Sequence, residues 1–214
     1  MHKLDRSLAI EPVCLAKYHY RTHTWDDVKE DKQKIRESLE QMQDVRCAYC
    51  EGPVYADGHI EHFRRKNKNH FPSLTFVWSN LFLACGSQDH CGHYKDRPGA
   101  LRYDSNNLVK PDEHEPDQYF YFHSSGDVLP RSGINAQDLA RATETIRVFN
   151  LKCAILGANR RRALRIYQQK QPGILEVLME FDEKTRQDFI DQEIQATRLE
   201  PHGTVIRHYF ERAF

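Results

Sequence analysis

Hydrophobic residues early in the chain recur with the period of an α-helix. Thr24 is a typical N-cap, and the two acidic residues Asp26 and Asp27 suit the positive end of a helix dipole. Four apolar residues then fall on one helical face, at spacings of seven, four and three positions: Val28, Ile35, Leu39 and Met42. The pattern predicts a helix through residues 25–43 that leads into the first cysteine pair.

The middle of the chain alternates between strand-like and turn-like segments. We expect a short hairpin within residues 52–63, a polar loop after it, and an apolar segment at residues 74–85. An aromatic run at residues 119–122 has the composition of a strand, and a Ser-Gly-Asp turn follows it. From Asn135 onward the apolar spacing is helical almost to the end of the sequence.

These elements predict an α+β fold in three parts. Residues 1–45 form an N-terminal helical segment, residues 46–130 a central module that holds both cysteine pairs, and residues 131–214 a C-terminal helical region. The stretch "NRRRALRIY", residues 159–167, could follow a nucleic-acid backbone. The solvated face of an amphipathic helix is the favoured interpretation.

The composition describes a soluble, folded protein. Hydrophobic residues make up 39% and charged residues 29% of the 214 positions, which is unlike a disordered chain. No apolar run approaches the roughly 20 residues that cross a membrane. The N-terminus lacks the apolar stretch of a signal peptide, so we expect a cytoplasmic protein with reduced thiols. Because 31 basic residues balance 31 acidic ones, nucleic-acid binding must be local or assisted by a partner.

Four of the six cysteines form two close pairs. Cys47 and Cys50 have the C-x2-C spacing of a zinc knuckle, and Cys85 and Cys91 form a longer C-x5-C pair. In a reducing compartment, two such pairs predict one tetrahedral site for a structural Zn2+. His90 could replace one of the thiolates. The other two cysteines are isolated and are expected to be ordinary buried residues.

The stretch "DGHIEHFRRKNK", residues 57–68, crowds two imidazoles and a carboxylate together. On a strand, His59 and Glu61 project from one face and His62 from the other. A carboxylate suits a divalent ion, and a neutral histidine suits a general base. Four cations follow and could offset the charge of phosphates: Arg64, Arg65, Lys66 and Lys68. Together these groups predict a metal-assisted phosphodiester hydrolase.

Four stretches, "CAYCE", "GHIEHFRRK", "WSNLFLAC" and "CGHYKD", resemble in order and spacing the HNH endonucleases, whose active site is a ββα-metal finger. The segments on either side resemble more closely the PtuB proteins, the HNH proteins associated with Septu and retron systems. The resemblance spans roughly residues 1–165 and is strongest from 24 to 130. It implies a ββα-metal nuclease module, stabilised by zinc and flanked by helices. It also implies a role in bacterial anti-phage defence together with the ATPase PtuA.

The resemblance assigns the central chemistry to individual residues. His62 would deprotonate the attacking water, and Glu61 would bind the catalytic Mg2+ or Mn2+. His93 would be the second ligand of that ion. Gly92 stands where many HNH proteins have Asn or His, so His90 is an alternative to His93. The expected products carry 5′ phosphate and 3′ hydroxyl ends.

Further residues receive supporting roles. By the same resemblance, Asn80 would tie down the loop between the second strand and the helix. His59 would touch the metal or phosphate, or be structural. Lys95 and the four cations of residues 64–68 would contact phosphates, or form a solvated charged loop.

DNA is the favoured substrate, with RNA, including tRNA, as the alternative. A non-catalytic zinc-binding adaptor and a redox-sensing dithiol protein are the competing function classes.

Overall fold

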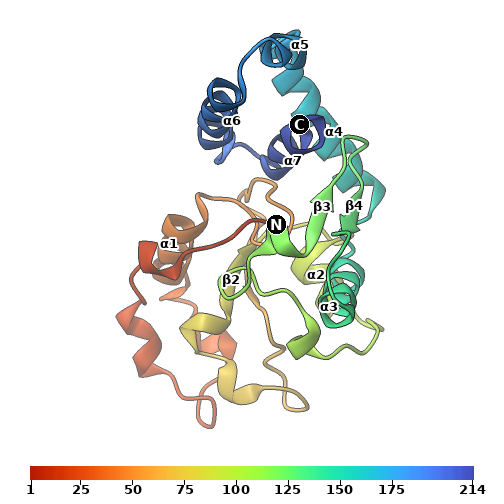
Figure 1. The fold of residues 1–214 in the computed structure, drawn as a ribbon. Coiled ribbons are helices and arrows are strands. Elements are labelled where there is room, and N and C mark those ends of the chain that lie inside the picture. The colour runs from red at the N-terminus through yellow and green to blue at the C-terminus, as the bar shows by residue number, and fades with distance from the viewer.

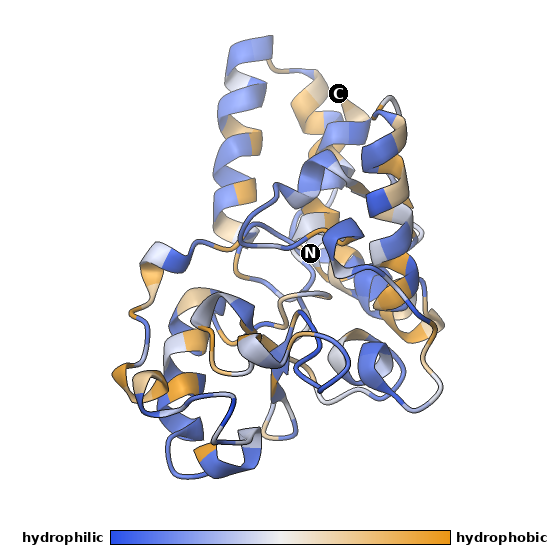
Figure 2. Cartoon of the chain, turned by 90° about the horizontal axis from the view of Figure 1, so that it is seen from below, coloured by the Kyte–Doolittle hydropathy of each residue, from blue (hydrophilic) through white to orange (hydrophobic).

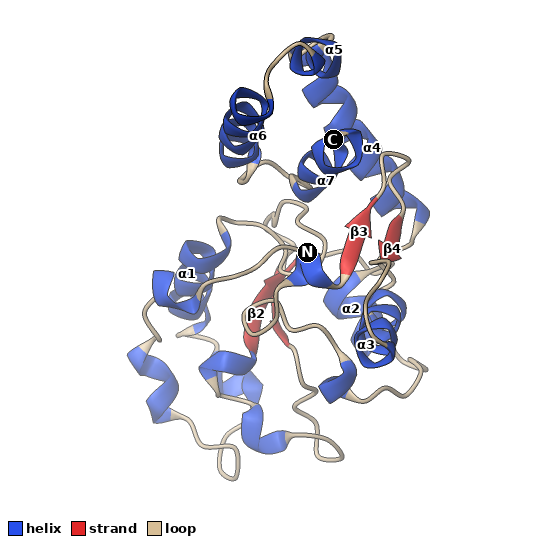
Figure 3. Cartoon of the chain, viewed as in Figure 1, coloured by secondary structure: helices blue, strands red, loops and turns tan.

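The computed structural model describes residues 1–214 and confirms the α+β class (Figure 1). Seven α-helices accompany two antiparallel sheets of two strands each (Figure 3). The helices are α1 (Lys32–Gln43), α2 (Cys91–Asp96), α3 (Ala136–Val148), α4 (Ala154–Lys170), α5 (Ile174–Met179), α6 (Glu183–Thr197) and α7 (Thr204–Ala213). The strands are β1 (His59–His62), β2 (Leu81–Ala84), β3 (Phe120–Phe122) and β4 (Val128–Pro130). Helices α4 to α7 gather at one end of the molecule, above β2 in Figure 1.

The first predicted helix is shorter than its sequence pattern. Residues 25–28 form a separate 3₁₀ turn, closed by a capping box between Thr24 and Asp27, and α1 begins only at Lys32. The apolar stripe itself is confirmed, because all four of its residues are buried and α1 packs against β2. The turn also has a tertiary contact of its own, because the Trp25 ring stacks on Phe76 at 6.2 Å.

The predicted hairpin within residues 52–63 is wrong. Pro53 instead forms an isolated bridge with Arg46, so this segment is already paired with the residues before the first cysteine. The partner of β1 is β2, with His59 opposite Ala84 and His62 opposite Leu81. All four side chains of β2 are buried, so the hydrophobic effect favours this distant strand over a local partner.

The strand predicted at residues 119–122 and the turn after it are confirmed, and the structure makes them part of a hairpin. β3 pairs with β4, and Gly126 in the connecting turn has φ +86°, a conformation that glycine adopts without steric cost. Gly126 also lies against α4, where a Cβ atom would come within 2.1 Å of the carbonyl oxygen of Gly157. The absence of a side chain therefore lets the hairpin dock on α4.

The arginine-rich stretch of α4 is only partly a solvated face. Arg161, Arg162 and Arg165 are exposed. Arg160 is buried: its Nη1 donates to the carbonyl oxygens of Gly126 and Leu151, at 3.1 and 2.9 Å. The sequence-based interpretation is therefore wrong for Arg160, which joins the hairpin to the helical region.

One continuous core crosses the boundaries between the three predicted parts. It contains 42 buried hydrophobic residues, from Met1 to Phe210. Hydrophobic and hydrophilic segments alternate along the same helices, as amphipathic packing requires (Figure 2). None of the helices combines the length and the apolar character needed to span a bilayer.

Candidate functional site

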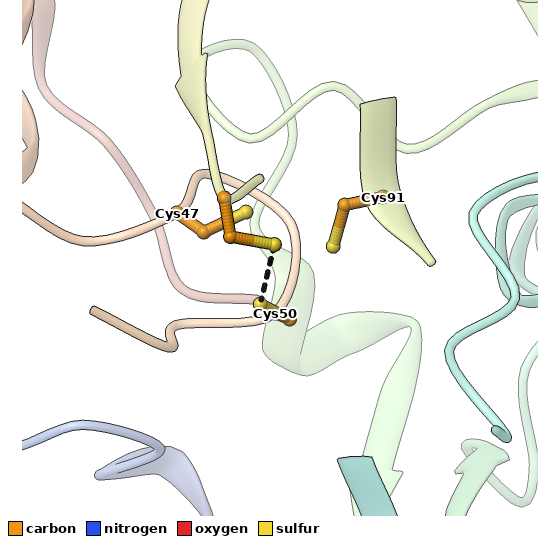
Figure 4. Close-up of side chains that lie close together, drawn as sticks. Cys47, Cys50 and Cys91 are labelled. Atoms are coloured by element: carbon orange, nitrogen blue, oxygen red, sulfur yellow. Dashed lines mark hydrogen bonds between the residues drawn. The ribbon is translucent and has the colours of Figure 1, made fainter. Parts of the chain in front are cut away.

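The two cysteine pairs come together at one place, as the sequence predicts. The sulfur atoms of Cys47, Cys50, Cys85 and Cys91 all lie within 4.8 Å of one another. Figure 4 shows the side chains of Cys47 and Cys50, which share one turn, converging with that of Cys91 from the start of α2. The Sγ atoms of Cys50 and Cys85 are 3.9 Å apart, close to the roughly 3.8 Å edge of a tetrahedron with Zn–S bonds of about 2.3 Å. This quartet could bind a metal ion such as zinc.

Backbone hydrogen bonds position each of the two cysteine pairs in the quartet. The first pair sits on a tight turn after α1, in which the Cys47 amide donates to the Gly52 carbonyl at 2.8 Å. The second pair begins directly after β2 and ends at the first residue of α2. Its long spacing is anchored by the residues that end α3. The Cys91 backbone amide donates to the Phe149 carbonyl at 2.9 Å, and the side-chain Nδ2 of Asn150 donates to the Asp89 carbonyl.

His90 lies beside the quartet without being needed to complete it. Its Nδ1 atom is 3.1 Å from the Cys91 sulfur and 3.6 Å from the Cys85 sulfur. It therefore contacts the thiols, whereas His93 stacks on the His59 ring at a centroid distance of 3.8 Å. The structure thus groups His93, rather than His90, with the histidine and carboxylate of β1.

Glu61 is the centre of a buried polar group at the β1–α2 contact. One carboxylate oxygen lies 2.7 Å from the Lys95 ammonium and the other 3.1 Å from His59 Nε2. Burial alone would raise the pKa of Glu61, but the Lys95 charge and the His59 hydrogen bond outweigh it and lower the pKa to about 2. Glu61 is therefore a carboxylate at any physiological pH.

Gly92 makes the close approach of α2 to Glu61 sterically possible. A Cβ atom at this position would lie 2.5 Å from Glu61 Oε2 and 2.8 Å from His59 Nε2. No side chain larger than hydrogen fits without displacing one of them. The glycine at position 92 thus has a physical reason in this chain, and His93 follows at the position where α2 passes the two β1 residues.

His62 is buried on the opposite face of β1, next to different neighbours. Its Nε2 atom lies 2.9 Å from the Thr75 carbonyl oxygen, and its Nδ1 atom lies 3.5 Å from the Lys66 ammonium. Burial lowers the pKa of His62 to about 3, and the Lys66 charge acts in the same direction. A carbonyl can only accept and an ammonium can only donate. The imidazole is therefore neutral, with its proton on Nε2 and its lone pair on Nδ1.

Asn80 holds the long connection between the two strands of this sheet. Its Oδ1 accepts from the Arg64 amide at 2.8 Å, and its Nδ2 donates to the carbonyls of Arg64 and Leu74 at 3.0 and 3.1 Å. The loop that it binds precedes the second strand, whereas the sequence resemblance implied the loop that follows it. Through Leu74, Asn80 also fixes the neighbouring Thr75 carbonyl that accepts from His62.

The five predicted phosphate-contacting cations do not form one open surface. Lys95 is buried, and its ammonium is occupied by Glu61, by Asp96 and by the His62 carbonyl. The Arg65 guanidinium pairs with Asp96 at 2.7 Å. Lys68 is exposed, while Arg64 and Lys66 are half-buried beside the site. The prediction of a phosphate contact is therefore not supported for Lys95, because the carboxylates of its own module neutralise it.

One sizeable cavity lies away from this chemistry. A cleft of about 850 Å³ separates the cysteine quartet from the C-terminal helices and is lined by Cys50, Cys85, Arg162, Tyr167 and His202, among others. None of Glu61, His62 or His93 lines it. We place the candidate site at Glu61, His62 and His93, whose pKa values are all lowered, rather than in this cleft.

Sequence reasoning missed two groups that contact His62: the Thr75 carbonyl and the Trp25 ring, whose centroid is 4.5 Å from that of the imidazole. Neither gives a recognisable signal in the sequence, because a carbonyl belongs to every residue and Trp25 lies 37 positions away along the chain.

No protein-family model matches the chain, and no curated protein matches it either.

Proposed function

We propose that this protein is a metal-dependent endonuclease of the HNH type that hydrolyses phosphodiester bonds in nucleic acid. The observation that carries the proposal is His62, a neutral imidazole whose Nε2 donates to the Thr75 carbonyl and whose Nδ1 lone pair faces the Lys66 ammonium. A general base needs this protonation state at the pH where it works.

The arrangement around Glu61 supports the same function. The β1–β2–α2 order places Glu61, His59 and His93 next to one another, with the half-buried His93 ring stacked on His59. Glu61 Oε2 is an oxygen donor of the kind that Mg2+ or Mn2+ prefers, and His93 would supply a second donor through a ring nitrogen. Such an ion would stabilise the charge that develops on the phosphate and the leaving oxygen.

The protein residues then have distinct tasks in the proposed reaction. In this reaction His62 Nδ1 would accept a proton from water while the water oxygen forms a bond to phosphorus. The bond to the 3′ oxygen would break, and that oxygen would take a proton from solvent to give the 3′ hydroxyl, while the phosphate stays on the 5′ side. Lys66 lies beside Nδ1 and would move from the imidazole to the incoming phosphate. Lys95 keeps Glu61 oriented. The cysteine quartet, with zinc bound, would fix the first residue of α2 relative to β2.

The proposal also includes a biological role. We infer that the protein is the effector of a bacterial anti-phage defence complex that contains a PtuA-like ATPase. The support comes from the sequence resemblance and from the zero net charge, which provides no overall attraction for nucleic acid. DNA is the favoured substrate, with RNA, including tRNA, as the alternative.

The test compares His62→Ala with a matched surface histidine, His70→Ala, which lies exposed in the same connection between the strands. Purified zinc-loaded proteins are incubated with plasmid DNA and with total RNA, with Mg2+ or Mn2+, with and without the candidate ATPase. We expect cleavage by the wild type and by His70→Ala, and a loss of about 10²- to 10⁴-fold in His62→Ala. If the wild type cuts neither substrate in any of these conditions, a non-catalytic zinc-binding adaptor becomes the better description.

A further inference from the structure

Trp25 reaches His62 from outside the β1–β2–α2 unit. The two rings are 4.5 Å apart between centroids, and their planes cross at 85°, the geometry of an edge-to-face aromatic pair. Trp25 opens the 3₁₀ turn that the Thr24–Asp27 capping box closes, so its backbone is fixed by its own segment. The contact therefore joins two segments that are each held independently.

Other aromatic rings support Trp25 from behind. Phe76 stacks on Trp25 at 6.2 Å, with planes 29° apart, and Tyr18 stacks on Phe76 at 5.4 Å, with planes 25° apart. Phe76 directly follows Thr75, whose carbonyl accepts from His62. The imidazole is thus contacted by the Thr75 carbonyl and by the Trp25 ring, which itself packs on the next loop residue, Phe76.

The imidazole needs such contacts to fix its orientation, because its χ2 torsion has no single preferred value of its own. The χ2 angle of histidine has broad, roughly two-fold minima, unlike a staggered aliphatic torsion. A half-turn about χ2 would exchange Nδ1 for a carbon atom and Nε2 for another carbon. The flipped ring would keep nearly the same shape but would present no lone pair on the side where Lys66 now lies.

We propose that Trp25 is a positioning residue for His62, whose indole holds the imidazole with Nε2 on the Thr75 carbonyl and Nδ1 directed to the reacting water. This inference rests on the proposed nuclease function and adds to it a residue from the N-terminal segment. It assigns to residues 24–28 a part in the active site that lies beyond the ββα unit.

The experiment uses three variants of the full-length, zinc-loaded protein. Trp25→Leu keeps apolar bulk but removes the ring, and Trp25→Phe restores a ring. Tyr20→Leu is the matched control, because Tyr20 is another partly buried aromatic residue of the same segment that packs on the core, and its ring contacts are His19 and Arg21 instead of His62. Cleavage is followed as kcat and KM with the substrate found above. The His62 Nε2 proton is followed by NMR on protein labelled with 15N-histidine.

We expect Trp25→Leu to lower kcat by about 10- to 100-fold, with KM changed less than about twofold, because a misdirected base affects the chemical step and not binding. The slowly exchanging Nε2 proton signal should disappear in the same variant. Trp25→Phe should recover most of both properties, and Tyr20→Leu should resemble the wild type.

Two results would overturn the inference: an unchanged Nε2 proton signal in Trp25→Leu, or equal losses of kcat in Trp25→Leu and Tyr20→Leu. The NMR measurement does not depend on activity. If the wild type cleaves nothing, the nuclease proposal fails by itself, and proton exchange still decides whether Trp25 fixes the ring.

Discussion

Replacing Gly92 by alanine tests the packing of the candidate site most directly. Gly92 lies in α2, and its added Cβ would lie 2.5 Å from Glu61 Oε2, whereas ordinary contacts begin near 3.4 Å. The carboxylate would have to move by about 1 Å, the scale of change by which overpacking strains a core. It cannot move freely, because the same group is held at 2.7 Å from Lys95 and 3.1 Å from His59.

The magnitude follows from two opposing effects. Alanine in a helix is normally more stable than glycine by roughly 0.5–1 kcal/mol. Overpacking at a buried site costs about 1–3 kcal/mol, and here it also strains a buried ion pair. We expect Gly92→Ala to lower the free energy of unfolding by about 1–2 kcal/mol, and to reduce cleavage about 100-fold, because a displacement of about 1 Å misaligns the reacting groups.

Gly157→Ala in α4 is the matched control, because its Cβ would meet nothing closer than 3.6 Å. It should be as stable as the wild type or slightly more stable. The assay is urea unfolding at neutral pH with saturating zinc, together with metal content and cleavage rates in Mn2+. If Gly92→Ala proves as stable as Gly157→Ala and equally active, the assigned contact between α2 and Glu61 is incorrect.

Three further predictions concern the zinc site, the loop that Asn80 holds, and the dependence of stability on pH. Cys85→Ser should lose bound zinc and unfold the central module, since such sites contribute about 10 kcal/mol, while Cys153→Ser, outside the quartet, should keep its zinc in the same metal analysis. Asn80→Ala leaves three partly buried backbone groups without their partner and should lower the free energy of unfolding by about 1–3 kcal/mol in urea unfolding. An unchanged midpoint would contradict its role in holding the loop. Burial lowers the pKa of His208 from 6.5 to about 3, so the unfolded state binds its proton first and stability falls as the pH drops from 6.5 toward 3. Between pH 7 and 5 this group should cost about 2 kcal/mol, and an unfolding series with His208→Gln should show a flatter pH dependence than the wild type.

Local patterns in the sequence determined a large part of the structure. The apolar stripe of α1, the hairpin of β3 and β4, and the helices after Asn135 follow from spacing and turn residues that act over a few positions. The four paired cysteines could be grouped without coordinates, because two closely spaced pairs are typical of a single metal site. The neighbouring His59, Glu61 and His62 were likewise visible as candidate chemistry.

Only the tertiary structure decided how these parts meet. The partner of β1 lies about twenty positions away and replaces the local hairpin, because β2 buries all of its side chains. Lys95 has the sequence appearance of a phosphate contact, yet burial directs its ammonium to Glu61. The neighbours of His62, including Trp25, come from segments with no periodic relation to it. Periodicity reports which face of an element is apolar, but contacts between distant segments depend on packing, burial and charge pairing, which are settled only when the whole chain has folded.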